Sequence, residues 1–350
     1  MSGGVDSSLA AKLMIDQGYD CIGCTMKLYN NEDLDLKKSR TCCSLDDIWD
    51  AKSVAYKLGM PFYVFNFTEA FKKLVIDKFV KSYEKGMTPN PCIDCNRYMK
   101  FDKLFERGKI LGCDYIVSGH YARIEYKDGK YLLKKALDKS KDQSYVLYSL
   151  TQEQLAHTKF PLGEMKKTDV RILAEKNDFI NSNKPDSQDI CFVPNKKYGE
   201  FIEKYSGKIS PSGDFIDLSG KIIGTHKGII QYTLGQHKKL GSNLSRKMYV
   251  CKICPENNTI TLGDEKELLS KEVIVKDFNW IAGIPLKDSI RCMAKTRYSQ
   301  KEEWVTAIPL DENSLCLIFD IPQRAVTPGQ AAVLYDGDIV LGGGTISIKK

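Results

Sequence analysis

The stretch that most constrains the fold of this chain is SGGVDSS (residues 2–8), which runs directly into the apolar segment 9–14. Glycines before a helix let the backbone bend so that successive N–H groups point one way, and serine hydroxyls and the helix N-terminus add donors and positive potential. This combination predicts a phosphate-binding loop. Because no lysine follows the glycines, the loop is not the lysine-containing one of the common nucleoside triphosphatases.

A loop of this kind is expected directly after a β-strand, because a doubly wound α/β sheet holds its ligands at the carboxyl ends of its strands. Met1 stands where the last residue of that strand is expected. We interpret this as a start codon assigned too late, since the absence of a central strand would leave the backbone groups of two neighbouring strands unpaired. We therefore expect the 350-residue form to fold poorly.

The chain length of 350 residues predicts at least two cores. The formal charge of +7 includes lysine pairs such as Lys166-Lys167 and suits an anionic partner, although lysine runs are more often solvated faces. The sequence has neither a membrane-length apolar run nor a charged-then-apolar leader, which predicts a cytoplasmic protein without membrane contact. In that compartment, twelve cysteines favour thiol chemistry, metal binding or small core residues over structural disulfides.

Hydrophobic periodicity predicts α/β alternation over residues 1–204. The expected elements are a helix ending near Gly18, strands at 21–28, 62–65 and 115–117, helices at 45–58, 68–85 and 95–111, and a hairpin at 122–135. Thr151 to Gln154 reads as helical, Thr168 is expected to cap a helix at 169–177, and residues 182–194 read as a loop. Short β-type runs after Gly207 predict a mainly β central domain at 205–269 and a small β-barrel or sandwich at 270–350.

Three cysteines stand out for their surroundings. Cys92 and Cys95 lie three residues apart at the mouth of a predicted helix, where the positive helix N-terminus stabilises thiolate over thiol and makes sulfur nucleophilic. Cys191 lies in the polar segment DSQDICF (residues 186–192), where a lone cysteine is by itself more often structural. Cys21 and Cys24 fall on a predicted strand, where they would face opposite sides of the sheet, so we do not count them as ligands. Cys42-Cys43 adjoin a loop, and the sequence leaves open whether they are ligands or ordinary cysteines.

The loop SGGVDSS resembles the pyrophosphate loop of ATP pyrophosphatases, enzymes that transfer AMP to a carbonyl-type oxygen and release pyrophosphate. Together with TPNPCIDCN, SGHYAR, KDQSYVLY, DSQDICF, TLGQHKKLG and TRYSQ in this order, it makes the whole chain similar to the tRNA-specific 2-thiouridylase family. The resemblance implies an N-terminal doubly wound parallel sheet of the adenine nucleotide alpha hydrolase type. It also implies an ATP-dependent tRNA-uridine 2-sulfurtransferase that forms 2-thiouridine at the wobble position.

The same resemblance implies roles for individual residues. ATP would contact Ser2, Gly3, Gly4, Val5, Asp6, Ser7 and Ser8, with Met26 on the adenine side, Gly119 near the nucleotide and Mg²⁺ at Asp6. Cys95 would be the nucleophile and Cys191 the persulfide carrier, and the two would join in a transient disulfide. The chemistry is consistent with two thiols, because the adenylated C2 oxygen leaves when persulfide sulfur attacks, and a second thiol must then cleave the S–S bond.

Contacts to tRNA or to the target base are implied at Asn90, Pro91, Cys92, His120, Lys141, Asp142, Gln143, Arg297, Tyr298 and Gln330. Arg297 and Tyr298 offer a guanidinium beside an aromatic ring, a pair able to hold phosphate and stack a base turned out of an anticodon loop. The family also implies a protein sulfur donor, either a cysteine desulfurase or a sulfur-relay protein.

The chain departs from many family members at Cys92, where the pattern often carries an aspartate. One alternative is therefore an iron–sulfur cluster on Cys92, Cys95 and Cys191, and a simpler one is a zinc site that uses the C-x-x-C pair. Two rival functions are another ATP pyrophosphatase with a non-sulfur nucleophile and a non-catalytic RNA-binding module with structural zinc. The rival enzyme does not require Cys95 and Cys191, whereas the binding module predicts no release of pyrophosphate.

Overall fold

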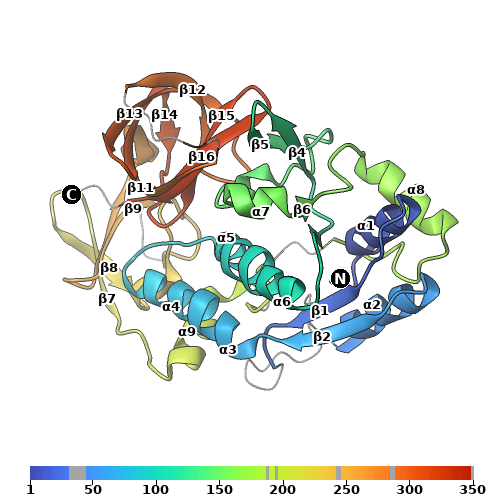
Figure 1. Ribbon diagram of the computed structural model, residues 1–350. Helices are drawn as coiled ribbons and strands as arrows, with labels where there is room; N and C mark the ends of the chain where they lie inside the picture. The colour runs from blue at the N-terminus through green and yellow to red at the C-terminus, as the bar shows by residue number, and fades with distance from the viewer. Residues whose placement is uncertain are drawn as a thin grey trace.

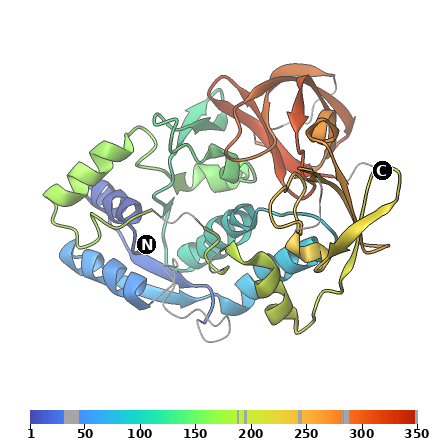
Figure 2. The ribbon, with the colours of Figure 1, turned by 180° about the vertical axis from the view of Figure 1, so that it is seen from behind.

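The computed structural model describes residues 1–30, 45–186, 189–193, 196–241, 246–281, 283 and 288–347. The pair Cys42-Cys43, and Ser187, Gln188 and Pro194 of the predicted loop, lie outside these described residues. An α/β region in blue and green is followed by a smaller, mainly β region in yellow and by a β region in orange and red (Figures 1 and 2). This confirms the predicted order of fold types.

The N-terminal region is built from parallel strands joined by helices. Helix α1 (Val5–Asp16) begins at the glycine loop and buries Val5, Leu9 and Met14. Strands β1 (Gly23–Lys27) and β2 (Phe62–Asn66) pair in parallel across α2 (Leu45–Lys57), and β3 (Ile116–Val117) pairs in parallel with β6 (Thr158–Lys159). Within the described residues these pairs form two separate two-stranded sheets.

Two long helices follow β2, and each contains a π-helical segment; the second carries the predicted Cys92 and Cys95. The first consists of α3 (Thr68–Phe71), π-helical η1 (Lys72–Ile76) and α4 (Asp77–Glu84). The second consists of α5 (Pro91–Asp94), π-helical η2 (Cys95–Lys103) and α6 (Leu104–Ile110). The second helix begins four residues before the predicted Cys95, because Asn90 caps it and Pro91 suits the first helical position.

The following segment connects the α/β region to the rest of the molecule. The predicted hairpin is present as β4 (Ala122–Lys127) and β5 (Lys130–Lys135), and it is followed by 3₁₀-helix η3 (Ser144–Leu147). Helix α7 (Gln152–Ala156) has the predicted capping box. The prediction that Thr168 caps α8 (Lys167–Lys176) is wrong: Lys166 is the N-cap, and Asp138 accepts the Lys167 backbone N–H at 3.0 Å, which lets the helix begin earlier.

The central region starts with α9 (Tyr198–Ser206), which runs across Lys204, the position of the predicted boundary. It continues with β7 (Gly213–Ile216), β8 (Ile222–His226), 3₁₀-helix η5 (Ile229–Gln231), β9 (Tyr249–Cys254) and β10 (Thr259–Gly263). The four strands form one sheet in the order β8-β7-β10-β9, in which β7 and β10 are parallel.

The C-terminal region is a closed β-barrel rather than a sandwich. After 3₁₀-helix η6 (Glu265–Leu268), its strands are β11 (Leu269–Trp280), β12 (Ile290–Lys295), β13 (Glu303–Asp311), β14 (Ser314–Arg324), β15 (Ala331–Asp336) and β16 (Ile339–Ile346). The order β11-β14-β13-β12-β15-β16 closes through the additional pairing of β11 with β16. Closure satisfies the backbone groups of what would otherwise be edge strands.

The regions are joined by shared cores and by strand pairing. Strand β16 pairs with β5 at Ile339 and Lys134, so the barrel sheet continues into the N-terminal hairpin. One hydrophobic cluster contains Phe79 of α4 together with Phe215 and Ile260 of the central sheet. Among the described helices, none has the length and apolarity needed to cross a membrane.

Candidate active site

The glycine–serine loop has the backbone shape of an anion cradle. Gly3 has φ of +70°, and a Cβ there would lie 2.4 Å from the Asp47 carbonyl oxygen, so the position requires glycine. Gly4 is the N-cap of α1, and its carbonyl accepts hydrogen bonds from the Ser7 and Ser8 hydroxyls at 3.0 and 3.2 Å. The first N–H groups of α1 have no intrahelical acceptors and are available to a bound anion.

The loop is held from behind by the segment after α8. The buried Asn181 side chain donates to the Gly3 carbonyl at 3.0 Å and to the Ser8 hydroxyl at 2.9 Å. The Lys184 ammonium lies 3.3 Å from the same Gly3 carbonyl and pairs with Asp47 and Asp50. Burial opposes the charge of Lys184, but these carboxylates outweigh it and raise the lysine pKa, which keeps a cation beside the loop.

Asp6 belongs to a charged network rather than standing alone. The buried Lys167 ammonium contacts both Asp6 carboxylate oxygens, at 2.6 and 2.7 Å, and the Tyr121 hydroxyl donates to the same carboxylate at 2.8 Å. Lys167 also pairs with Asp186 at 2.9 Å. Burial disfavours ionisation of Asp186, but hydrogen bonds from Lys141 and Lys167 outweigh it and lower the pKa to about 2.

Gly119 follows the end of β3, and Met26 lies near the end of β1. A Cβ on Gly119 would be 2.6 Å from the Asp6 carbonyl carbon and 2.8 Å from the Ser7 nitrogen, so this loop lies directly against the first turn of α1. Met26, in β1, is partly buried and packs against the cluster that contains Phe79. Gly119 therefore packs against the phosphate loop, and its contact with a nucleotide stays a prediction.

The helix that carries Cys92 and Cys95 starts with a complete cap. The Asn90 side chain accepts the Cys92 backbone N–H at 3.1 Å, and Pro91 follows Asn90. Cys92 is exposed and Cys95 is half-buried. Asp94, only 6% exposed, accepts from Lys78 at 2.6 Å; burial raises its pKa, and Lys78 opposes that shift.

The segment that carries Cys191 is anchored by its neighbour Phe192. The Phe192 ring is 1% exposed and lies 5.7 Å from Phe71 and 5.3 Å from Phe79, both in edge-to-face geometry. The Tyr29 hydroxyl donates to the Cys191 carbonyl at 2.9 Å. Cys95 and Cys191 both pack at the margin of this one hydrophobic cluster, so the fold brings the two predicted thiols to the same part of the molecule.

The barrel also reaches this area through Tyr298. Burial chiefly, and then the negative charges of Asp142 and Cys92, raise the pKa of Tyr298. The Tyr298 hydroxyl donates to the Asp142 carbonyl at 3.1 Å, while the residue remains 46% exposed. An accessible aromatic ring near the thiols suits stacking of an unpaired base.

The remaining residues that were predicted to contact tRNA are held by internal hydrogen bonds. His120 is buried, lies 2.8 Å from the Ser118 hydroxyl and 3.4 Å from the Lys100 ammonium, and has a pKa lowered by burial and by Lys100, which keeps it neutral. Gln143 accepts the Tyr121 backbone N–H at 2.9 Å. The other contacts are Lys141 to Asp186 (2.9 Å), the Ala136 N–H to Asp142 (3.0 Å), Arg297 to the Ala325 carbonyl and Thr327, and Gln330 to the Thr88 carbonyl (2.6 Å).

The described residues give no support to a metal centre on the cysteines. Cys92, Cys95 and Cys191 are all described, yet within the described ranges no group of three His, Cys, Asp or Glu side chains is arranged to hold a metal ion. A three-cysteine iron–sulfur or zinc site requires such a group.

Sequence reasoning missed the residues that surround the loop, namely Tyr121, Lys167, Asn181 and Lys184. Their contacts with Asp6, Gly3 and Ser8 join residues more than a hundred positions apart, which no local spacing reveals. Asp186 could have been identified from the sequence, because it is the first residue of the motif DSQDICF that contains Cys191.

Three family models together match almost the whole chain. Residues 1–195 match the tRNA methyl transferase HUP domain, residues 199–264 the tRNA methyl transferase PRC-barrel domain, and residues 270–346 the aminomethyltransferase β-barrel domain. The fold and the loop thus define a three-part protein whose N-terminal domain is of the HUP, phosphate-loop class.

The curated relatives specify the family. The chain is 50% identical over 348 residues to tRNA-specific 2-thiouridylase MnmA of Clostridioides difficile, covering 99% of this chain and 96% of that protein. It is 50% identical over 349 residues to the protein of the same name from Acetivibrio thermocellus, covering 99% and 97%. The chain belongs to the tRNA-specific 2-thiouridylase family.

A solved NMN synthetase from Francisella tularensis is similar over 59% of this chain and 75% of its own, at 14% identity and a TM-score of 0.32. That score is too low to support a statement about this chain.

Proposed function

We propose that this protein catalyses the ATP-dependent 2-thiolation of the wobble uridine in tRNA. The observation that carries the proposal is the link between the phosphate loop and the thiols. Asp186, five residues before Cys191, is joined through Lys167 to Asp6 of the loop. Family membership supplies the substrate class, because the relatives are named for tRNA 2-thiolation. Since tRNA is used in the cytoplasm, the proposed activity is cytoplasmic.

ATP is the substrate that activates the uridine. Its chemistry is to transfer AMP to the C2 oxygen, with release of pyrophosphate, so that the oxygen becomes part of a good leaving group. The residue set fits a polyphosphate: a glycine with positive φ, the free N–H groups of a first helical turn, and the nearby cations Lys167 and Lys184. In this proposal Ser2 to Ser8, Met26 and Gly119 would surround ATP, and the Asp6 carboxylate would hold the Mg²⁺ that offsets the charge of the phosphates.

Two cysteines divide the sulfur chemistry between them. The terminal sulfur of a Cys191 persulfide attacks C2, a C–S bond forms, and the C2–O bond breaks as AMP leaves. The Cys95 thiolate then attacks the Cys191 sulfur and breaks the S–S bond, which leaves sulfur on the base and a Cys95–Cys191 disulfide. A thiol reductant reopens that disulfide, and a protein donor, a cysteine desulfurase or a sulfur-relay protein, supplies the next persulfide sulfur.

The target base and the tRNA would be held between the domains that meet at the thiols. We propose that the domains divide near residue 270, as the sequence predicts, and before α9 rather than at residue 204, because α9 is continuous across Lys204. Asn90, Pro91 and Cys92 would lie beside the base, and the exposed Tyr298 ring would stack on it. His120, Lys141, Asp142, Gln143, Arg297 and Gln330 already have partners inside the protein, so we propose that they support the tRNA site by holding its walls.

The test is product analysis with a matched cysteine control. Purified protein is incubated with unmodified tRNA, Mg-ATP and a persulfide donor, and nuclease-digested nucleosides are identified by mass spectrometry. We expect a uridine with the oxygen-to-sulfur mass shift, lost in Cys191→Ser and in Cys95→Ser but retained in Cys113→Ser, a half-buried cysteine outside the cluster. Pyrophosphate release accompanied by a modification without sulfur would contradict the proposal.

A further inference from the structure

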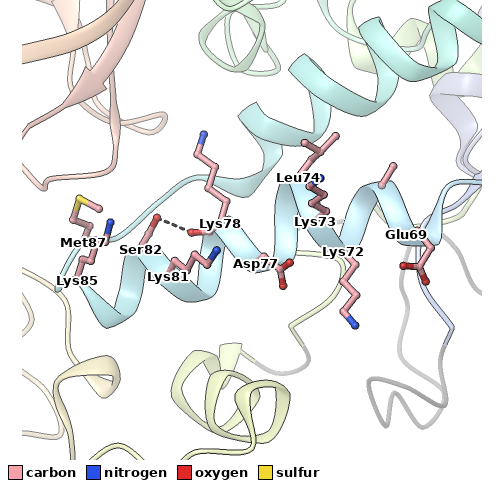
Figure 3. Close-up of a pocket in the computed structure, with 11 residues that line it drawn as sticks. Glu69, Lys72, Lys73, Leu74, Asp77, Lys78, Lys81, Ser82, Lys85 and Met87 are labelled. Carbon is pink, nitrogen blue, oxygen red and sulfur yellow. Dashed lines mark hydrogen bonds between the residues drawn. The ribbon is translucent and has the colours of Figure 1, made fainter.

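A lysine-rich groove runs along the first of the two long helices. It has a volume of about 960 Å³ and is lined along residues 69–87 of α3, η1, α4 and the turn that follows (Figure 3). Its lysines are Lys72, Lys73, Lys78, Lys81 and Lys85, all exposed. The opposite face of this helix is buried in the large hydrophobic cluster through residues such as Val75 and Phe79, so the helix presents its lysines from a fixed position.

The positive charge of the groove is only partly neutralised by the protein around it. Its carboxylates are Glu69 and Asp77, and Asp77 accepts a hydrogen bond from the Tyr205 hydroxyl at 2.7 Å. Lys78 pairs with Asp94. The other four lysines of the groove form no ion pair with any described residue. The helix dipole favours Lys81 and Lys85, which lie in the last turn and at the C-cap of α4, but it does not account for Lys72 and Lys73 near the start of this helix.

The composition of the groove distinguishes a nucleic acid from a protein partner. Protein interfaces are enriched in aromatic residues and depleted in lysine, whereas this groove has five lysines and no aromatic lining residue. Lysine ammonium groups act as point charges that contact phosphates without reading the base. The thirteen steps from Lys72 to Lys85 extend about 20 Å along a helix, a length over which an RNA backbone presents several phosphates.

The groove also leads toward the thiols. Met87 lines one end, and Thr88 to Asn90 connect it to the helix that carries Cys92 and Cys95. The seven residues from Lys85 to Cys92 span at most about 25 Å. A tRNA whose wobble base reaches the thiols therefore has stem phosphates within range of the groove.

We propose that this groove binds backbone phosphates of the tRNA stem next to the anticodon loop and so fixes the direction in which the tRNA enters the site. The inference rests on the proposed function for the identity of the RNA. The groove would supply sequence-independent affinity, while the base is selected at the thiols.

The test is the salt dependence of tRNA binding, measured without thiolation. Filter binding of unmodified tRNA is compared for wild type, the double variant Lys81→Gln/Lys85→Gln and the control double variant Lys52→Gln/Lys176→Gln. The control lysines are exposed on α2 and α8, at the other end of the α/β region (Figure 1). At about 0.9 logarithmic units per lost phosphate contact with a double-stranded stem, we expect about 60-fold weaker binding at 0.1 M salt and a salt slope shallower by about 1.8 for the groove variant only.

Equal affinity and slope in the groove and control variants would overturn the proposal. Unchanged tRNA binding, with thiolation reduced only when sulfur comes from a donor protein and not from a small persulfide, would also overturn it and assign the groove to that donor. If the wild type binds tRNA with the expected difference from the groove variant but makes no thiouridine, the groove proposal stands and the proposed function fails. Matching urea midpoints for all three proteins would confirm intact folds.

Discussion

The contact between Gly119 and the phosphate loop predicts a large effect from a single methyl group. In Gly119→Ala the new Cβ would lie 2.6 Å from the Asp6 carbonyl carbon, and 2.8 Å from both the Asp6 oxygen and the Ser7 nitrogen. Ordinary van der Waals contacts begin near 3.4 Å, so the two segments must separate by about 0.8 Å. All three atoms belong to the backbone and cannot rotate away, and overpacking of this kind costs about 1–3 kcal/mol.

The same displacement moves the first turn of α1, where ATP phosphates are proposed to bind. A misplacement of about 1 Å at a reacting centre reduces rates by up to about 100-fold. We therefore expect a lower urea midpoint together with pyrophosphate release reduced by about 10- to 100-fold. Gly224→Ala is the matched control, because its Cβ would lie 3.6 Å from Phe215, an ordinary contact. A Gly119→Ala protein as stable and as active as Gly224→Ala would refute the reasoning.

Three further predictions concern groups at or near the site. Lys167→Met leaves the Asp6 and Asp186 carboxylates without their shared buried cation, and urea unfolding should show a loss of up to about 3 kcal/mol; an unchanged midpoint would contradict this. His120 is buried and neutral with a lowered pKa, so the unfolded chain gains a proton below about pH 6.5 that the folded protein does not take up. The melting temperature of the wild type should consequently fall more between pH 7 and pH 5 than that of His120→Gln, and parallel pH curves would exclude this role. Gln330→Ala removes the hydrogen bond to the Thr88 carbonyl, four residues before Cys92, and should lower kcat at saturating tRNA; a change confined to KM would assign Gln330 to tRNA contact alone.

Local patterns were sufficient to predict most of the elements. The spacing of apolar residues predicted α2 to within one residue at its end, and Asp128-Gly129 predicted the turn of the β4–β5 hairpin. The start of the cysteine-bearing helix was predicted too late, although Asn90 and Pro91 are a cap signal. The pairing of β5 with β16 was not predicted, because it joins Lys134 to Ile339 and depends on how the barrel docks.

The candidate site was predictable where chemistry lies in short motifs. The glycine loop, the Cys92–Cys95 pair and Cys191 were all identified from sequence, and the structure gathers both thiol segments at one hydrophobic cluster. The residues that contact the loop were not identified from the sequence. Lys167, for example, has no sequence feature that distinguishes it from a surface lysine, and it is buried against Asp6 only because α8 packs beside α1. For the same reason Gln330 and Arg297 looked accessible in the sequence but are hydrogen-bonded within the protein.

The π-helical segment that begins at Cys95 determines the direction in which this cysteine faces on its helix. Each residue of an α-helix turns the chain by about 100°, and a π-helix is commonly an α-helix that has accommodated an extra residue. Deleting one residue between Asn96 and Lys103 would therefore restore regular α-helical winding and keep the turns on either side in register. Without this wider winding, the additional residue would rotate Cys95 by about 100° relative to the buried Phe105, and in the proposed function that rotation would turn the Cys95 thiol away from Cys191.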